Sequence, residues 1–193
     1  SGGITTRQFN GRNPISPLLN SLATLLTEKN YLKIYEKSYA RIGYSQELSN
    51  GIYMSSSLEY AERKPLFNTS NYVIFGQEDR SFTSNNPLDP TNNLSAPFER
   101  HNIWTFNLGA NIVFGQKYLS YPNGKFSVGN RKFPSLYLGY RKTFGSSIAS
   151  YNSDLLVARL NQFVSTGSGG DLRYTIRTGA FLKQKDIAFM DYL

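Results

Sequence analysis

Residues 102–116, which read Asn-Ile-Trp-Thr-Phe-Asn-Leu-Gly-Ala-Asn-Ile-Val-Phe-Gly-Gln, carry the clearest strand pattern of this sequence. Every second residue from Trp104 to Phe114 is apolar, and threonine, asparagine and glycine stand between them as far as Asn111. Successive side chains of a strand point to opposite faces, so this alternation predicts a long strand with one apolar and one polar face. The large side chains on the apolar face would be Trp104, Phe106, Leu108, Ile112 and Phe114.

Further stretches on both sides of this segment alternate in the same way. They cover residues 31–48, 52–63, 135–143, 154–166 and 172–183, and residues 4–9 are a weaker candidate. Asn50-Gly51 separates the first two, and Asn-Gly between strands is a strong hairpin signal because both turn positions favour positive φ. Several of these strands exceed ten residues, whereas about 5–6 is usual. The chain is therefore predicted to be all-β, with antiparallel neighbours in up-and-down order.

One helix is expected near the start of the chain, over about residues 17–29. Ser16-Pro17 suits a helix entry, because serine caps helices and proline is tolerated at the first helical position. Leucines then recur at helical spacing, at Leu18, Leu19, Leu22, Leu25 and Leu26. The helix is therefore predicted to be short and amphipathic.

The connections between the predicted strands differ in length. Residues 64–101 form a long polar loop, and loops of this length tend to be functional or mobile. Because antiparallel strands alternate in direction, the connections should alternate between the two ends of the sheet. One end would hold the helix and the loops 64–101 and 145–152. The other end would hold the connections 50–51, 118–133 and 167–171.

The composition excludes several classes of protein. The 193 residues include no cysteine and one histidine, His101, and they carry a formal net charge of +8. These counts exclude disulfides, zinc fingers, iron–sulfur clusters and a multi-histidine metal site. No apolar run reaches the roughly 20 residues of a spanning helix. The 14 tyrosines and 13 phenylalanines contrast with a mean hydropathy of −0.41, a combination that alternating strands reconcile.

Two β architectures fit the alternation. In a membrane barrel one face meets lipid and the other a wet lumen, whereas in a soluble sheet one face meets a core. The strand lengths favour the barrel, because a tilted strand needs about 9–11 residues to cross a bilayer. We therefore predict an antiparallel up-and-down membrane β-barrel, of which residues 1–193 form one segment of a larger barrel. The apolar side chains named above would face lipid.

Basic residues gather on the predicted polar faces of the last three strands. This set, expected to face the lumen, comprises Arg141, Arg159, Arg173, Arg177 and Lys183. Such residues either make the lumen favourable for anions or an acidic partner strand, or they pair with acids such as Glu59 and with loops or a plug. The second arrangement is favoured, because inward charges in barrels are usually networked.

Basic and aromatic residues also alternate along the first long strand. Lys33, Lys37 and Arg41 share one face, and Tyr31, Tyr35 and Tyr39 lie between or beside them. This pattern occurs in single-stranded nucleic-acid platforms and equally at lipid–water boundaries. The chain has no RNP-like sequence, glycine-rich phosphate loop or recognition helix. No nucleic-acid partner is predicted.

No catalytic motif stands out. The sequence lacks G-x-S-x-G, H-E-x-x-H and a P-loop. His101 ends the long loop, where a lone histidine is usually a surface residue. Asp89, Thr91 and Asn93 match the start of a calcium loop, but the required glycine and closing glutamate are missing. We predict no catalytic residue, no cofactor and no metal.

Four stretches resemble a Bacteroidota outer-membrane family: residues 13–22, 29–37, 58–68 and 133–141. Among them, Asn-Pro-Ile-Ser-Pro-Leu-Leu-Asn-Ser-Leu begins at Asn13, and Phe-Pro-Ser-Leu-Tyr-Leu-Gly-Tyr-Arg begins at Phe133. Members of this family combine an N-terminal carboxypeptidase-regulatory-like β-sandwich with a C-terminal domain of unknown function that forms a barrel. The resemblance implies the bacterial outer membrane and a barrel, and it implies no catalytic residue. The regulatory-like domain and the strands that close the barrel are expected outside this chain.

Three functions follow as hypotheses. The first is an integral outer-membrane β-barrel component with a structural, transport or assembly role and no chemistry of its own. Its partners would be the lipid bilayer and other outer-membrane or periplasmic proteins. The alternative is a soluble β-rich binding module that uses the basic aromatic face, and the third is an outer-membrane hydrolase centred on His101.

Overall fold

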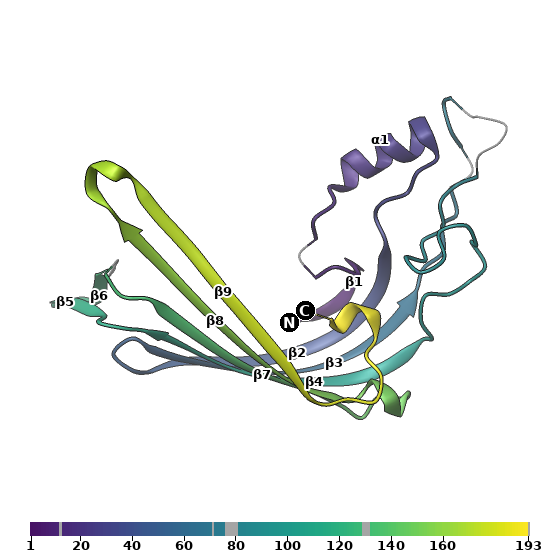
Figure 1. The fold of residues 1–193 in the computed structure, drawn as a ribbon. Helices are drawn as coiled ribbons and strands as arrows, with labels where there is room; N and C mark the ends of the chain where they lie inside the picture. Colours follow the sequence, from purple (N-terminus) through teal and green to yellow (C-terminus); the bar gives the residue numbers. More distant parts are fainter. Residues whose placement is uncertain (12, 71, 76–80, 129–131, 193) are drawn as a thin grey trace.

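The computed structural model describes residues 1–11, 13–70, 72–75, 81–128 and 132–192. An antiparallel sheet with the strand order β1-β2-β3-β4-β7-β8-β9 dominates the structure (Figure 1). Its strands are β1 (Gly2–Gln8), β2 (Ile34–Ser49), β3 (Ile52–Pro65), β4 (His101–Val113), β7 (Ser135–Phe144), β8 (Ser153–Ser165) and β9 (Asp171–Lys183). The predicted antiparallel β-sheet with one helix is confirmed, and β1 corresponds to the weaker candidate at residues 4–9.

The connection between β2 and β3 is the hairpin that Asn50-Gly51 predicts. The pairing runs from Tyr35 opposite Pro65 to Ser49 opposite Ile52. Gly51 adopts φ +79°, and a Cβ at this position would lie 2.5 Å from the carbonyl oxygen of Val113. Only glycine satisfies both the positive φ and the close approach of β4.

Two short strands occupy most of residues 118–133, so the prediction of a loop there is wrong. β5 (Lys117–Tyr121) and β6 (Gly124–Val128) form an antiparallel hairpin there, separate from the main sheet. Gly124 has φ +141° at the turn, and the rings of Tyr121 and Phe126 lie 5.5 Å apart. Each strand has five residues, which is too short for alternation to stand out from a polar loop.

The helix α1 (Pro17–Thr27) begins with the proline at its first turn, as predicted, and ends two residues before the predicted limit. Glu28 follows in the left-handed conformation, and its N–H donates to the carbonyl oxygen of Thr24. The Ser16 side chain makes no capping hydrogen bond, so its predicted capping role is wrong. None of the helix residues is buried.

The connections sort to the two ends of the sheet as predicted. At one end, called the loop end here, lie α1, the connections 66–100 and 145–152, and the C-terminal segment 184–192, which includes the 3-10 turn η3 (Phe189–Asp191) (Figure 1). The opposite end, called the turn end, holds the β2–β3 turn, the β5–β6 hairpin and the connection 166–170.

The buried core is small and lies at the loop end. Phe9, Tyr35 and Phe98 pack with ring centroids 5.5 to 6.0 Å apart, and Met190 packs against them. Elsewhere the sheet is covered on neither face by another described element, as Figure 1 shows. In the described ranges β1 and β9 are the two edges and are not paired with each other, so this sheet is open.

Candidate functional site

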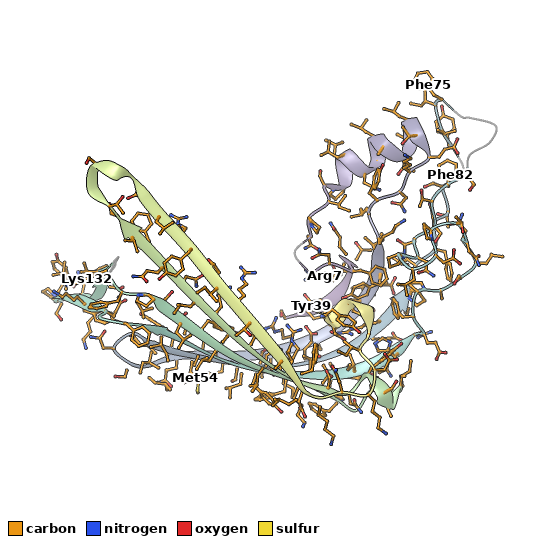
Figure 2. The ribbon with its side chains drawn as sticks, in the orientation of Figure 1. Arg7, Tyr39, Met54, Phe75, Phe82 and Lys132 are labelled. Carbon is orange, nitrogen blue, oxygen red and sulfur yellow. The ribbon has the colours of Figure 1, made fainter. Side chains whose placement is uncertain are left out.

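One face of the sheet, called the apolar face here, is hydrophobic and exposed. The strand register places eleven exposed large apolar residues of β2–β4 and β7–β9 on this face. They are Ile42, Tyr44, Ile52, Tyr60, Trp104, Leu108, Leu138, Phe144, Leu156, Leu172 and Ile176. Exposure reaches 73% at Ile42 and 58% at Ile176. Met54, labelled beneath the sheet in Figure 2, belongs to the same face.

The five residues predicted to face lipid lie on or beside this face. Trp104, Phe106, Leu108 and Ile112 alternate along β4, and their neighbours on β3 and β7 continue the face. Trp104 and Leu108 are each 38% exposed. Phe114 follows the last residue of β4 and is 43% exposed. A shallow apolar hollow of about 540 Å³ lies over the middle of the face, between Leu108 and Leu156.

A row of aromatic rings bounds the apolar face toward the loop end. Trp104 lies 5.0 Å from the ring of Tyr60 and stacks on Phe144 at 6.4 Å. The pair Lys142–Asp154, with Nζ and Oδ1 3.2 Å apart, lies beside this row. The apolar face therefore ends where aromatic rings and the first charges appear.

Beyond the aromatic row the same face becomes ionic. Lys64 Nζ lies 3.2 Å from Glu36 and 3.7 Å from Glu62. The Nε–H of Arg100, in the long loop, donates to Glu62 at 2.6 Å. These groups are partly exposed and screened by water, so each pair adds little stability. Their importance is positional, because they mark a sharp change from apolar to charged surface.

The opposite face, called the polar face here, carries the predicted basic set. Arg159 stands directly opposite Arg177, and Arg173 stands opposite Phe163. Arg141 lies opposite Asn107 on β4. The register thus brings the four arginines of the set to one face. Lys183 differs, because at a register shift it pairs with Asp154, a residue of the apolar face.

Aromatic rings support two of these arginines. The Arg159 guanidinium lies 5.2 Å from the centre of the Tyr137 ring, and Arg173 lies 5.7 Å from that of Phe163. Tyr137 in turn covers two glycines, since a Cβ at Gly109 or Gly139 would lie 2.9 Å from it. Cation–π contacts hold these guanidiniums close to the sheet.

Two ion pairs occupy the polar face near the loop end. Lys37 Nζ lies 2.6 Å from Glu59. Arg63 donates to both oxygens of Asp191, at 2.6 and 3.0 Å, and both residues are buried. Asp191 comes from η3, 128 residues after Arg63. No local pattern in the sequence could have indicated this pairing.

His101 is fully buried, so the expectation of a surface histidine is wrong. Phe98 and Tyr151 pack edge-on against its ring at 5.6 and 4.8 Å. Its Nδ1 lies 2.8 Å from the Glu99 carbonyl oxygen, and its Nε2 has no partner. Burial lowers the pKa of His101 from its ordinary value of 6.5. Without a hydroxyl at Nε2, the ring forms no Ser–His pair in the described chain.

The long loop is held to the sheet by a buried asparagine. The amide nitrogen of Asn85 donates to the carbonyl oxygens of Ile34 and Leu66, each at 2.6 Å, and its oxygen accepts the Ile34 N–H.

In the stretch that matches the start of a calcium loop, the Thr91 hydroxyl donates to the Asp89 carboxylate at 3.0 Å. Among the residues that the structure describes, no group of three His, Asp or Glu could hold a metal ion. No described helix is long and apolar enough to span a membrane.

The fold and its two faces define a class of domain: an open antiparallel sheet with an exposed apolar face and a cationic polar face. The chain belongs to the family of unknown function DUF5686, whose C-terminal domain matches residues 1–193. The predicted resemblance to a C-terminal domain of unknown function is thereby confirmed. No curated protein and no solved structure matches the chain at a significant level. The Bacteroidota origin and the N-terminal regulatory-like domain stay predictions.

Proposed function

We propose that this chain is part of an integral β-barrel of the bacterial outer membrane, with a structural, transport or assembly role and no chemistry of its own. The observation that carries the proposal is the exposed apolar face with its aromatic boundary. Its partners would be the lipid bilayer and other outer-membrane or periplasmic proteins. The polar face would line the interior of the barrel.

Hydrophobic exposure on this scale is costly in water. Each Å² of apolar surface left in water forgoes about 25 cal/mol, and soluble monomers rarely expose contiguous apolar patches above a few hundred Å². Lipid contact removes this cost. Tyr and Trp concentrate at membrane–water interfaces, which matches the position of Tyr60 and Trp104 between the apolar residues and the ionic groups.

Strand length and backbone pairing support the same proposal. The strands from β2 to β9 in the main sheet have 10 to 16 residues, and about 9–11 suffice to cross a bilayer. In lipid every backbone N–H and C=O must be paired. The free edges of β1 and β9 would therefore pair with further strands, which close the barrel.

The single tryptophan allows a direct test. We expect the fluorescence of Trp104 to be quenched when the full chain is folded into vesicles of brominated phosphatidylcholine. Bromines near the headgroup end of the acyl chain should quench more than bromines near its terminal methyl group, because Trp104 lies in the aromatic row at the boundary. Steady-state fluorescence provides the measurement.

A matched variant places the probe on the other face. Trp104→Phe combined with Phe163→Trp moves the indole to the polar face of β8, where lipid bromines should quench much less. Equal quenching in both proteins would contradict the proposal. So would a chain that is folded and monodisperse in buffer without detergent, which is the behaviour of the soluble binding module.

A further inference from the structure

A hollow on the polar face concentrates positive charge near the loop end. It has a volume of about 260 Å³ and is lined by residues of β2, β3, β4, β7 and η3. Its charged lining consists of Lys37, Arg41, Arg63, Arg141, Glu59 and Asp191. Four cations thus face two carboxylates.

Both carboxylates already have a close cationic partner. Glu59 accepts from Lys37 at 2.6 Å. Asp191 accepts two hydrogen bonds from Arg63, at 2.6 and 3.0 Å. The acids therefore compensate Lys37 and Arg63, and the remaining two cations of the hollow are left without a counter-charge.

Arg41 and Arg141 have only neutral partners. Arg41 Nη2 donates to the Ser57 hydroxyl at 3.0 Å, and Arg141 Nε donates to the Asn107 side-chain oxygen at 3.3 Å. The Asn107 amide nitrogen donates to Ser57 at 3.4 Å, so a chain of polar groups connects the two guanidiniums across β3 and β4. Over the described ranges neither guanidinium forms a salt bridge with a carboxylate.

A second, independent feature points into the same hollow. Thr105 lines it, is only 8% exposed, and its hydroxyl has no hydrogen-bond partner. Buried hydroxyls are nearly always paired, because an unmade hydrogen bond is costly. This hydroxyl can donate to or accept from a group bound in the hollow.

We propose that the hollow between Arg41 and Arg141 binds a phosphate group, free or in a phosphate ester. A guanidinium has five N–H donors in a planar fork that suits the oxygens of phosphate, and each of these two uses one donor within the chain. The volume of about 260 Å³ corresponds to about nine waters at about 30 Å³ each, which is room for a phosphate. The proposal is independent of the membrane location, because the site lies within neighbouring strands and η3.

Calorimetric titration of inorganic phosphate into the folded full chain tests the site, at about 0.15 M ionic strength, where the Debye length is about 8 Å. The wild-type chain should bind phosphate. Arg41→Gln and Arg141→Gln should each weaken binding at least about tenfold, because each removes charge-assisted hydrogen bonds. Arg141→Lys keeps the charge but loses the fork, so an intermediate loss is expected. A parallel titration with glycerol 3-phosphate distinguishes a phosphate ester from free phosphate.

Arg177→Gln is the matched control. It removes one positive charge from the same polar face of the sheet, but on β9 and outside the hollow. This variant should change phosphate affinity by less than about twofold, because Arg177 is exposed and does not line the hollow, so dissolved salt screens its charge. If Arg141→Gln and Arg177→Gln reduced phosphate affinity equally, phosphate would be attracted by the overall positive charge of the polar face and not by a defined site. That result would overturn the proposal. Absence of binding by a correctly folded wild-type chain, or equally tight binding of acetate, would also overturn it.

Discussion

His101 shows how surroundings set the protonation of a single side chain. Its ring is enclosed by Phe98 and Tyr151, and its Nδ1 faces the carbonyl oxygen of Glu99. A carbonyl accepts, so Nδ1 carries the proton of a neutral imidazole. A second proton on the buried, unpartnered Nε2 would place an unpaired N–H and a charge in the core, beside Arg63. Burial therefore lowers the pKa of His101.

This makes the stability of the loop end depend on pH. The folded state binds a proton less readily than the unfolded chain, so stability is complete above the ordinary pKa of 6.5 and falls as the pH drops through it. We expect amide hydrogen exchange at the start of β4 to quicken relative to the rest of the sheet between about pH 8 and about pH 5.5, after correction for the intrinsic rate. Carboxylates with an ordinary pKa of about 4 stay ionised over that range.

The control is His101→Asn, whose amide can still donate to the Glu99 carbonyl oxygen but does not titrate. In this variant the corrected exchange rate should be nearly independent of pH over the same interval. A pH dependence as steep as that of the wild-type chain would show that another group is responsible.

Single residues were the hardest features to predict from the sequence. His101 ends a polar loop, which suggested exposure, yet rings from positions 98 and 151 cover it. Of the basic set, Arg141 and Arg159 reached the polar face because strand alternation is local and regular. Lys183 did not follow the set, since the register shifts beside Asp154.

At the scale of elements, the turns were predictable because their chemistry is local. Asn50-Gly51 forms the expected tight connection, and Gly51 needs both its positive φ and its missing Cβ. The helix end at Glu28 and the hairpin β5–β6 were less predictable. A left-handed glutamate carries no glycine signal, and five-residue strands give too few alternations to recognise.

Gly51→Ala should destabilise the chain strongly. A Cβ there would lie 2.5 Å from the Val113 carbonyl oxygen and 2.9 Å from Gln116 Cβ, in addition to the positive φ. The strain of the left-handed backbone alone costs about 1–2 kcal/mol, and the clash with β4 adds to it. Urea unfolding of the full chain measures the loss.

Gly167→Ala separates strain from clash. Gly167 has φ +67°, but a Cβ there would meet nothing within 4 Å. Only the backbone cost of about 1–2 kcal/mol is expected for it. If both alanine variants lose the same free energy of unfolding, the contact between the β2–β3 turn and β4 contributes nothing.

At the scale of the whole molecule, an introduced charge is expected to reduce folding stability on the apolar face of the sheet and to change it little on the polar face. Leu138 lies in the middle of the apolar face and is 45% exposed. If this face meets lipid, Leu138→Arg should reduce folding stability in vesicles by about 2–4 kcal/mol. In a water-exposed sheet the same change would be nearly neutral. Equilibrium folding in lipid vesicles measures the difference.

Ser55→Arg introduces the same side chain on the polar face of β3, where Ser55 is already exposed. It should change the folding stability by less than about 1 kcal/mol, as for a lumen substitution. The proposed membrane orientation fails if Ser55→Arg is as harmful as Leu138→Arg.

The sequence by itself determined the strands of the main sheet, their two faces and the sorting of connections to two ends. These features depend on period-two alternation and on turn residues, which act over a few neighbouring positions. Only the tertiary structure decided which charges are compensated by an opposite charge. It also decided that β1 and β9 are the unpaired edges of the described sheet. Arg63 finds Asp191 across 128 residues, while Arg41 and Arg141 meet only neutral groups. Such pairing depends on how distant strands and the C-terminal segment come together, because Coulomb and packing interactions depend on the separation of groups in space and not on their separation in the sequence.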